Sequence, residues 1–211
     1  IIYRESWDFL IKQYIPNILT LFRIFLVPVF VFQLLVEHNY LMSFIIFTIA
    51  SISDWADGYF ARKFNVVSRF GIFFDPLADK FLVLSAFISF LYIDSLSNIG
   101  AVEVWMVSII AFRDLSITIL RIIINLKGDY ILVTTNLAKM KTALQFISIN
   151  FILLALIVSN YFELIYYLMI ITTVITLYTG LHYYYKNAKK LSSILFNKWS
   201  FFHFHLTHFS L

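Results

Sequence analysis

Long apolar segments recur along the chain and are separated by short polar ones. A helix that crosses the hydrocarbon core of a bilayer, which is about 30 Å thick, needs about 20 predominantly apolar residues. Segments of this length occupy residues 17–36, 40–61, 71–93, 102–126, 137–159 and 162–185. The pattern therefore predicts an all-α integral membrane protein with six transmembrane helices.

The two ends of the chain follow other patterns. Trp7, Leu10, Ile11 and Tyr14 recur at helical spacing among polar residues, so residues 1–16 are predicted to form a short interfacial amphipathic helix. Residues 17–190 would form the transmembrane domain, and residues 191–211 an aromatic C-terminal tail that contains histidines. Two interpretations of this tail are open. It could bind a metal through its histidines, or rest on the lipid headgroups, which we prefer.

The composition agrees with a membrane protein. Hydrophobic residues make up 61% of the 211 positions and charged residues only 13%, and the mean hydropathy is +0.86. Soluble domains have about 45–50% apolar and about 25% charged residues, so a soluble globule and a disordered chain are both excluded. The chain has no cysteine, which rules out disulfides, thiol nucleophiles and cysteine-ligated zinc.

The distribution of basic residues predicts the orientation in the membrane. The loops at 37–39, 94–102 and 160–163 contain no lysine or arginine, whereas the other loops and both terminal segments do. Because basic loops stay in the cytoplasm, both termini are expected there. Most ionisable residues within the predicted spans then lie in the cytoplasmic half of the bilayer. That placement predicts a polar cavity open to the cytoplasm, with structural ion pairs such as Arg113–Asp114 as the alternative.

Four aspartates stand out among these buried charges. Asp54 and Asp57 share one helix face, and Asp75 and Asp79 are four residues apart on the next predicted helix. Four carboxylates repel each other unless a metal binds them, and their hard oxygens suit Mg²⁺ or Mn²⁺, often as two ions that assist phosphoryl chemistry. The residues alone thus predict a metal-dependent phosphotransfer enzyme that acts on a lipid.

The same segment resembles a family signature. D-x2-D-G-x2-A-R-x8-G-x3-D-x3-D is typical of the CDP-alcohol phosphatidyltransferases, and every fixed position from Asp54 to Asp79 matches it. Residues 15–23, 112–114 and 139–145 are similar to the bacterial branch that acts on sn-glycerol 3-phosphate. Two positions depart from that branch, which usually has Glu at Asp114 and Gly at Ala138.

The resemblance implies an activity. The enzyme would transfer the phosphatidyl group of CDP-diacylglycerol to sn-glycerol 3-phosphate, giving phosphatidylglycerol phosphate and CMP, in the cytoplasmic membrane of a bacterium. Asp79 would be the general base on the acceptor hydroxyl. By this resemblance, two Mg²⁺ or Mn²⁺ ions would be bound by Asp54, Asp57, Asp75 and Asp79. Contacts to the CDP moiety would come from Asp54, Gly58, Ala61, Arg62 and Gly71. The acceptor phosphate would be bound by Arg113, Arg121, Lys139 and Lys141.

Several alternatives stay open at this stage. Gly58 could serve close helix packing, and Lys139 and Lys141 could extend to the lipid headgroups. A sister enzyme would use phosphatidylglycerol, serine or an inositol phosphate as acceptor, although the basic residues favour a phosphorylated one. A cation transporter is the more distant alternative. The expected partners are the two substrates and membrane lipids but no nucleic acid, and a homodimer is a further expectation because family members often form one.

Overall fold

The structure is a computed structural model that describes residues 2–64, 69–126 and 136–207. Side chains are described for residues 18–53, 77, 78, 80–122, 124 and 140–188. The described residues are all-helical, and none of them lies in a strand. The helices are α1 (Ile2–Leu35), α2 (Tyr40–Phe64), α3 (Arg69–Phe90), α4 (Asp94–Ser97), α5 (Val104–Leu126), α6 (Asn136–Val158) and α7 (Phe162–Thr207).

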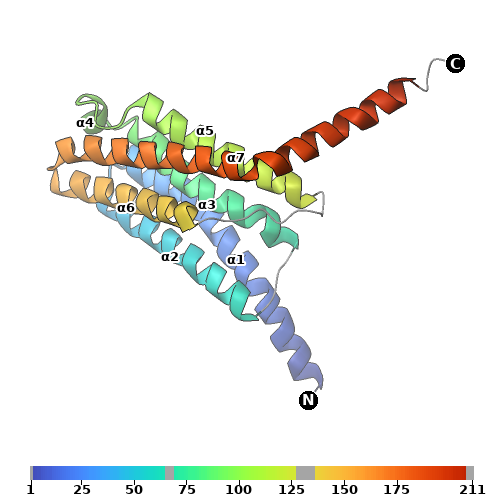
Figure 1. Cartoon of the computed structure of the whole chain (residues 1–211). Helices are drawn as coiled ribbons and strands as arrows, with labels where there is room; N and C mark the ends of the chain where they lie inside the picture. The colour runs from blue at the N-terminus through green and yellow to red at the C-terminus, as the bar shows by residue number, and fades with distance from the viewer. Residues whose placement is uncertain (1, 65–68, 127–135, 208–211) are drawn as a thin grey trace.

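The six long helices form one bundle (Figure 1). α1 packs against α2 and α3, α6 packs against α2 and α7, and α5 packs against α3 and α7. The helices come in up-and-down order. The short connections after α1, α3 and α6 therefore lie at one end of the bundle. The C-terminal ends of α2 and α5 and the start of α3 and α6 lie at the other end.

Two helices are longer than the hydrophobic pattern predicts. The expected interfacial helix at 1–16 is not a separate element, because α1 runs without interruption from Ile2 to Leu35. Pro16 removes one backbone hydrogen bond but does not end this helix, and such prolines are tolerated in membrane helices. At the other end of the chain, α7 continues to Thr207 and projects beyond the bundle (Figure 1). The division into three segments at 16/17 and 190/191 stays a prediction.

The short-loop end of the bundle contains the apolar core. Phe47 of α2 contacts the rings of Phe30 and Phe146, each at 5.8 Å between centroids. Phe87 and Phe90 of α3 meet edge to face at 6.5 Å. Aromatic pairs of this kind pack well and fix the helices at this end. The α1–α2 turn is local in origin, since the Asn39 side chain caps α2 by accepting a hydrogen bond from the Met42 amide at 3.0 Å.

The outside of the bundle is apolar and much of its inside is polar. Phe112 is 77% exposed on α5, whereas its neighbour Asp114 is 1% exposed. Large exposed apolar side chains occur on each of the six long helices. An apolar outer surface around buried charged side chains is unlike that of a water-soluble protein and suits a lipid environment. Within the described ranges, three segments are long and apolar enough to cross a membrane, namely Ile18–Leu35, Met140–Val158 and Phe162–Ala188.

Candidate active site

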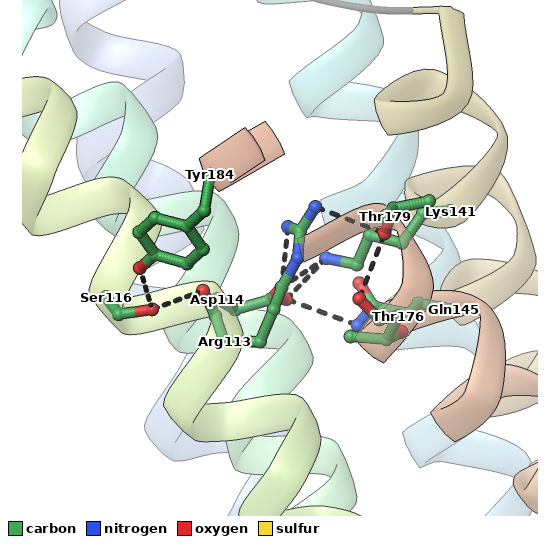
Figure 2. Close-up of polar contacts among 8 residues, drawn as sticks. All are labelled: Arg113, Asp114, Ser116, Lys141, Gln145, Thr176, Thr179 and Tyr184. Carbon is green, nitrogen blue, oxygen red and sulfur yellow. Dashed lines mark hydrogen bonds and ion pairs between the residues drawn. The ribbon is translucent and has the colours of Figure 1, made fainter. Parts of the chain in front are cut away.

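The polar end of the bundle brings charged side chains of α5 and α6 against α7. Asp114 on α5 lies at the centre of this cluster (Figure 2). The Lys141 ammonium on α6 donates to both carboxylate oxygens of Asp114, at 2.5 and 2.6 Å. Each of the two side chains is 1% exposed. A buried carboxylate is costly unless it is paired and hydrogen-bonded, and this one meets both conditions.

Two further donors complete the surroundings of the Asp114 carboxylate. Gln145 Nε2 donates to Oδ2 at 3.2 Å, and Arg113 Nη1 donates to Oδ1 at 3.1 Å. Gln145 follows Lys141 by one helical turn, so both reach the same carboxylate from one face of α6. The carboxylate therefore holds Lys141 and Arg113 in place and leaves one of the three Lys141 N–H donors for another acceptor.

Arg113 is held from the α7 side as well. Its Nη2 donates to the Thr179 hydroxyl at 3.2 Å, and this hydroxyl donates to the Thr176 carbonyl at 3.0 Å. A Cβ atom at Gly180 would lie only 2.7 Å from Arg113 Cγ. Glycine at this position of α7 thus gives Arg113 the space that it occupies. The buried Arg113 Nε has no hydrogen-bond partner among the described residues.

Arg121 lies about two turns further along α5. Its guanidinium is 5.4 Å from the centre of the Tyr183 ring on α7, a cation–π contact. Tyr183 is 2% exposed. Together the contacts of Arg113 and Arg121 tie α5 to α7 at the polar end.

These groups surround a small cavity of about 70 Å³. A single buried water needs about 10–15 Å³ of cavity volume, so this cavity has room for several waters or one small anion. Its lining contains four cationic side chains and one carboxylate, which leaves a formal excess of three positive charges. The charged lining residues are Lys80, Arg113, Arg121, Lys141 and Asp114. Such a lining favours a dianion such as a phosphate monoester.

The cavity brings together three of the four residues predicted to bind the acceptor phosphate, Arg113, Arg121 and Lys141. The fourth, Lys139, lies outside the described side chains. Lys141 does not extend to the headgroups, because it is buried against Asp114. The ion pair of Arg113 with Asp114 that the sequence suggests is also present, at 3.1 Å.

The aspartate motif is described only by its backbone. Asp54, Asp57, Gly58, Ala61 and Arg62 lie in the last turns of α2, and Gly71, Asp75 and Asp79 lie in the first turns of α3. Their side chains lie outside the described part of the structure. The described side chains contain no group of three or more histidines, cysteines or acids that could hold a metal. The metal site stays a prediction that rests on residues beyond that set.

The cavity and the aspartate motif are nevertheless adjacent along the chain. Lys80, which lines the cavity from α3, directly follows Asp79. The last aspartate of the motif is therefore the neighbour in sequence of a residue that lines the cationic cavity.

Sequence reasoning did not single out the α7 residues of the site. Thr179, Gly180 and Tyr183 occur in a segment whose hydropathy indicates only a span. The available signal was a helical stripe of hydroxyl and small residues among apolar ones. This stripe consists of Thr172, Thr176, Thr179, Gly180 and Tyr183.

Comparison with known proteins identifies the class. Residues 13–178 match the family model of the CDP-alcohol phosphatidyltransferases. The match covers more than half of the chain and includes both the aspartate motif and the α5 and α6 residues of the cavity. The chain belongs to the CDP-alcohol phosphatidyltransferase family.

Three similar curated relatives carry the name CDP-diacylglycerol–glycerol-3-phosphate 3-phosphatidyltransferase. The relative from Bacillus subtilis is 33% identical over 85% of this chain and 97% of its own length. The one from Rickettsia felis is 32% identical over 85% of this chain and 98% of its own length. The one from Escherichia coli is 47% identical over a shorter match, 35% of this chain and 42% of the relative.

Proposed function

We propose that this protein transfers the phosphatidyl group of CDP-diacylglycerol to sn-glycerol 3-phosphate, giving phosphatidylglycerol phosphate and CMP. The observation that carries the proposal is the cationic cavity, whose lining includes Lys80, the residue that follows Asp79 in the sequence. Its charge suits a phosphorylated acceptor and disfavours serine, which has no phosphate. The names of the full-length relatives support the same acceptor.

In the proposed reaction the acceptor is oriented by its phosphate. Arg113, Arg121 and Lys141, together with Lys139, bind the phosphate group and leave the hydroxyl end directed towards α3. Asp79 accepts the proton of the attacking hydroxyl. The new bond forms between the hydroxyl oxygen and the phosphorus that carries the diacylglycerol, and the bond from that phosphorus to the CMP oxygen breaks. Asp114 takes no proton in this scheme, because its carboxylate holds Lys141 and Arg113.

The metal dependence is part of the proposal. Asp54, Asp57, Asp75 and Asp79 form a donor set of four carboxylates, which fits hard cations such as Mg²⁺ or Mn²⁺. Two bound ions would neutralise the pyrophosphate and stabilise the departing CMP. Asp54, Gly58, Ala61, Arg62 and Gly71 would contact the CDP moiety, with the Arg62 guanidinium suited to phosphate oxygens.

The placement in the membrane follows from helix length and from the faces that the helices bury. α2, α3 and α5 have 25, 22 and 23 residues, long enough to cross about 30 Å of hydrocarbon. In α5 the buried charges face the bundle, and apolar side chains such as Phe112 face outwards. We therefore propose six spans in the cytoplasmic membrane of a bacterium, with the polar end of the bundle and both termini at the cytoplasmic side.

The test is CMP release by the purified protein in detergent, with CDP-diacylglycerol, Mg²⁺ and one acceptor at a time. We expect release with sn-glycerol 3-phosphate and none above background with serine, inositol phosphate or phosphatidylglycerol. Removal of divalent ions with a chelator should abolish release, and added Mg²⁺ or Mn²⁺ should restore it.

The Asp79→Asn variant should lose activity, whereas Asp94→Asn, in the short helix α4 at the other end, should keep it. If CMP were released with another acceptor and not with sn-glycerol 3-phosphate, the proposed reaction type would stand and the acceptor assignment would be wrong. Metal flux into liposomes without CMP release would favour a transporter.

A further inference from the structure

Tyr183 has an unusual environment for a buried tyrosine. The residue is 2% exposed, and its hydroxyl has no hydrogen-bond partner among the described residues. Buried tyrosine hydroxyls usually find a partner, because leaving one unpaired costs stability. An unpaired hydroxyl that is kept inside a polar site indicates a partner that arrives with the ligand.

The position of Tyr183 shows where that partner would lie. Tyr183 lines the cationic cavity together with Thr179, which precedes it by one turn on the same face of α7. Its ring packs 5.4 Å below the Arg121 guanidinium. The backbone carbonyl of Tyr183 accepts a hydrogen bond from Asn187 Nδ2 at 2.9 Å. The Arg121 contact therefore fixes the ring, and Tyr183 belongs to the lining of a cavity that also contains four cationic side chains.

The neighbouring Tyr184 provides the contrast. Its hydroxyl donates to the Ser116 hydroxyl at 2.9 Å (Figure 2), and Ser116 donates in turn to the Arg113 carbonyl at 3.0 Å. Tyr184 does not line the cavity. Its ring meets that of Tyr183 edge to face at 6.1 Å. The two tyrosines thus share a helix and a ring contact, but among the described residues only Tyr184 has a partner for its hydroxyl.

We propose that the Tyr183 hydroxyl donates a hydrogen bond to the phosphate of the acceptor and thereby helps to select a phosphorylated alcohol. This inference rests on the proposed function for the chemistry of the acceptor. A phosphate monoester brings three terminal oxygens that each accept more than one hydrogen bond, and a neutral phenol adds a donor without adding charge. Tyr183 also lies beyond residues 13–178, the part that matches the family model.

The pyrophosphate of the lipid donor is a second source of phosphate oxygens. The two substrates can be separated by kinetics, since a contact to the acceptor changes the KM for glycerol 3-phosphate and a contact to the donor changes the KM for CDP-diacylglycerol. Tyr183→Phe removes the hydroxyl and keeps the ring under Arg121. Tyr184→Phe is the matched control in the next residue.

For Tyr183→Phe we expect the KM for glycerol 3-phosphate to rise roughly 10- to 100-fold, the range for a lost hydrogen bond to a charged group. The kcat and the KM for CDP-diacylglycerol should change less than about threefold. Tyr184→Phe should leave both KM values near those of the wild type. The inference would be overturned if the two variants had the same KM for glycerol 3-phosphate. It would also be overturned if Tyr183→Phe raised only the KM for CDP-diacylglycerol.

A binding measurement separates this inference from the proposed function. Without ligand, Tyr183→Phe should unfold at the same temperature as the wild type or at a higher one, because it removes an unpaired buried hydroxyl. Glycerol 3-phosphate should raise the melting temperature of the wild type and of Tyr184→Phe, and should raise that of Tyr183→Phe less. If Tyr183→Phe shows the smaller rise but the protein releases no CMP, the phosphate contact is supported and the proposed reaction is refuted. An equal rise in all three proteins, or no rise in any, would refute the contact itself.

Discussion

At the short-loop end of the bundle, Phe47 packs against the rings of Phe30 and Phe146. At the opposite end, the interior holds the ion pair of Asp114 with Lys141. The same six helices build both ends. α5 contributes Met106 and Ile110 to the apolar core near its start and Asp114 to the polar cluster near its middle.

The two ends also differ in how completely their polar groups are paired. In the apolar end, Thr48 donates to Asn150 across α2 and α6 at 3.3 Å, a neutral contact with both groups engaged. In the polar end, buried atoms of Arg113, Gln145 and Tyr183 have no partner among the described residues. The apolar end therefore supplies packing, whereas the polar end keeps donors and acceptors ready for a ligand at some cost in stability.

The largest effect should come from breaking the central ion pair. Lys141→Met leaves the Asp114 carboxylate buried beside Arg113 and Gln145, which costs about 3–5 kcal/mol of folding free energy. CMP release should fall roughly 100-fold, because a cation at the acceptor phosphate is lost. Thermal unfolding and the CMP assay measure the two effects. Lys186→Met, at an exposed position of α7, should change neither.

The double variant Asp114→Asn with Lys141→Met sharpens this result. It removes both charges, so much of the lost stability should return while activity stays low. Full recovery of activity in the double variant would mean that the pair serves only the fold.

The next effect belongs to the apolar end. Phe47→Ala should cost about 2–3 kcal/mol, mainly for the cavity left behind, since lipid tails are as apolar as the core and the transfer contribution is small. The KM for glycerol 3-phosphate should stay within about twofold of the wild type. Phe32→Ala, at a half-exposed position of α1, is the control and should leave stability nearly unchanged. A selective rise in KM for Phe47→Ala would show that the two ends are not separable.

A smaller effect is expected at the contact of α5 with α7. Gly180→Ala places a Cβ 2.7 Å from Arg113 Cγ, and the strain of about 1–3 kcal/mol is partly offset by the higher helix propensity of alanine, about 1 kcal/mol. Arg113 must shift, so the KM for glycerol 3-phosphate should rise about 10-fold in steady-state assays. Leu181→Ala, exposed at the next position, should leave that KM unchanged.

The smallest effects compare one hydrogen bond in each end. Thr179→Val removes the contact to Arg113, and Thr48→Val removes the contact to Asn150. Each should cost about 0.6 kcal/mol of stability, the average for such bonds between membrane helices. Only Thr179→Val should also raise the KM for glycerol 3-phosphate, by a few-fold. Equal KM values in the two variants would contradict a role of Thr179 in holding Arg113.

The helix pattern was largely readable from the sequence. α2 and α7 begin at Tyr40 and Phe162, the residues that the apolar pattern predicts, and α5 ends at Leu126 as predicted. The short helix α4 was not predicted, because four residues carry too little periodicity. The continuation of α1 through Pro16 was also missed, since proline normally ends a helix in water and its local penalty alone does not decide the outcome.

The sequence by itself determined the apolar helical segments, the positions of the charged residues along them and the aspartate motif, because hydrophobic length and residue spacing are local properties. Only the tertiary structure decided which charges meet. Asp114 and Lys141 are 27 positions apart, and their pairing depends on how α5 and α6 are rotated about their axes. The same holds for Tyr183, which lines the cavity from α7, the helix that approaches Arg113 closely at Gly180. Helix packing fixes these rotations, and no local pattern encodes them.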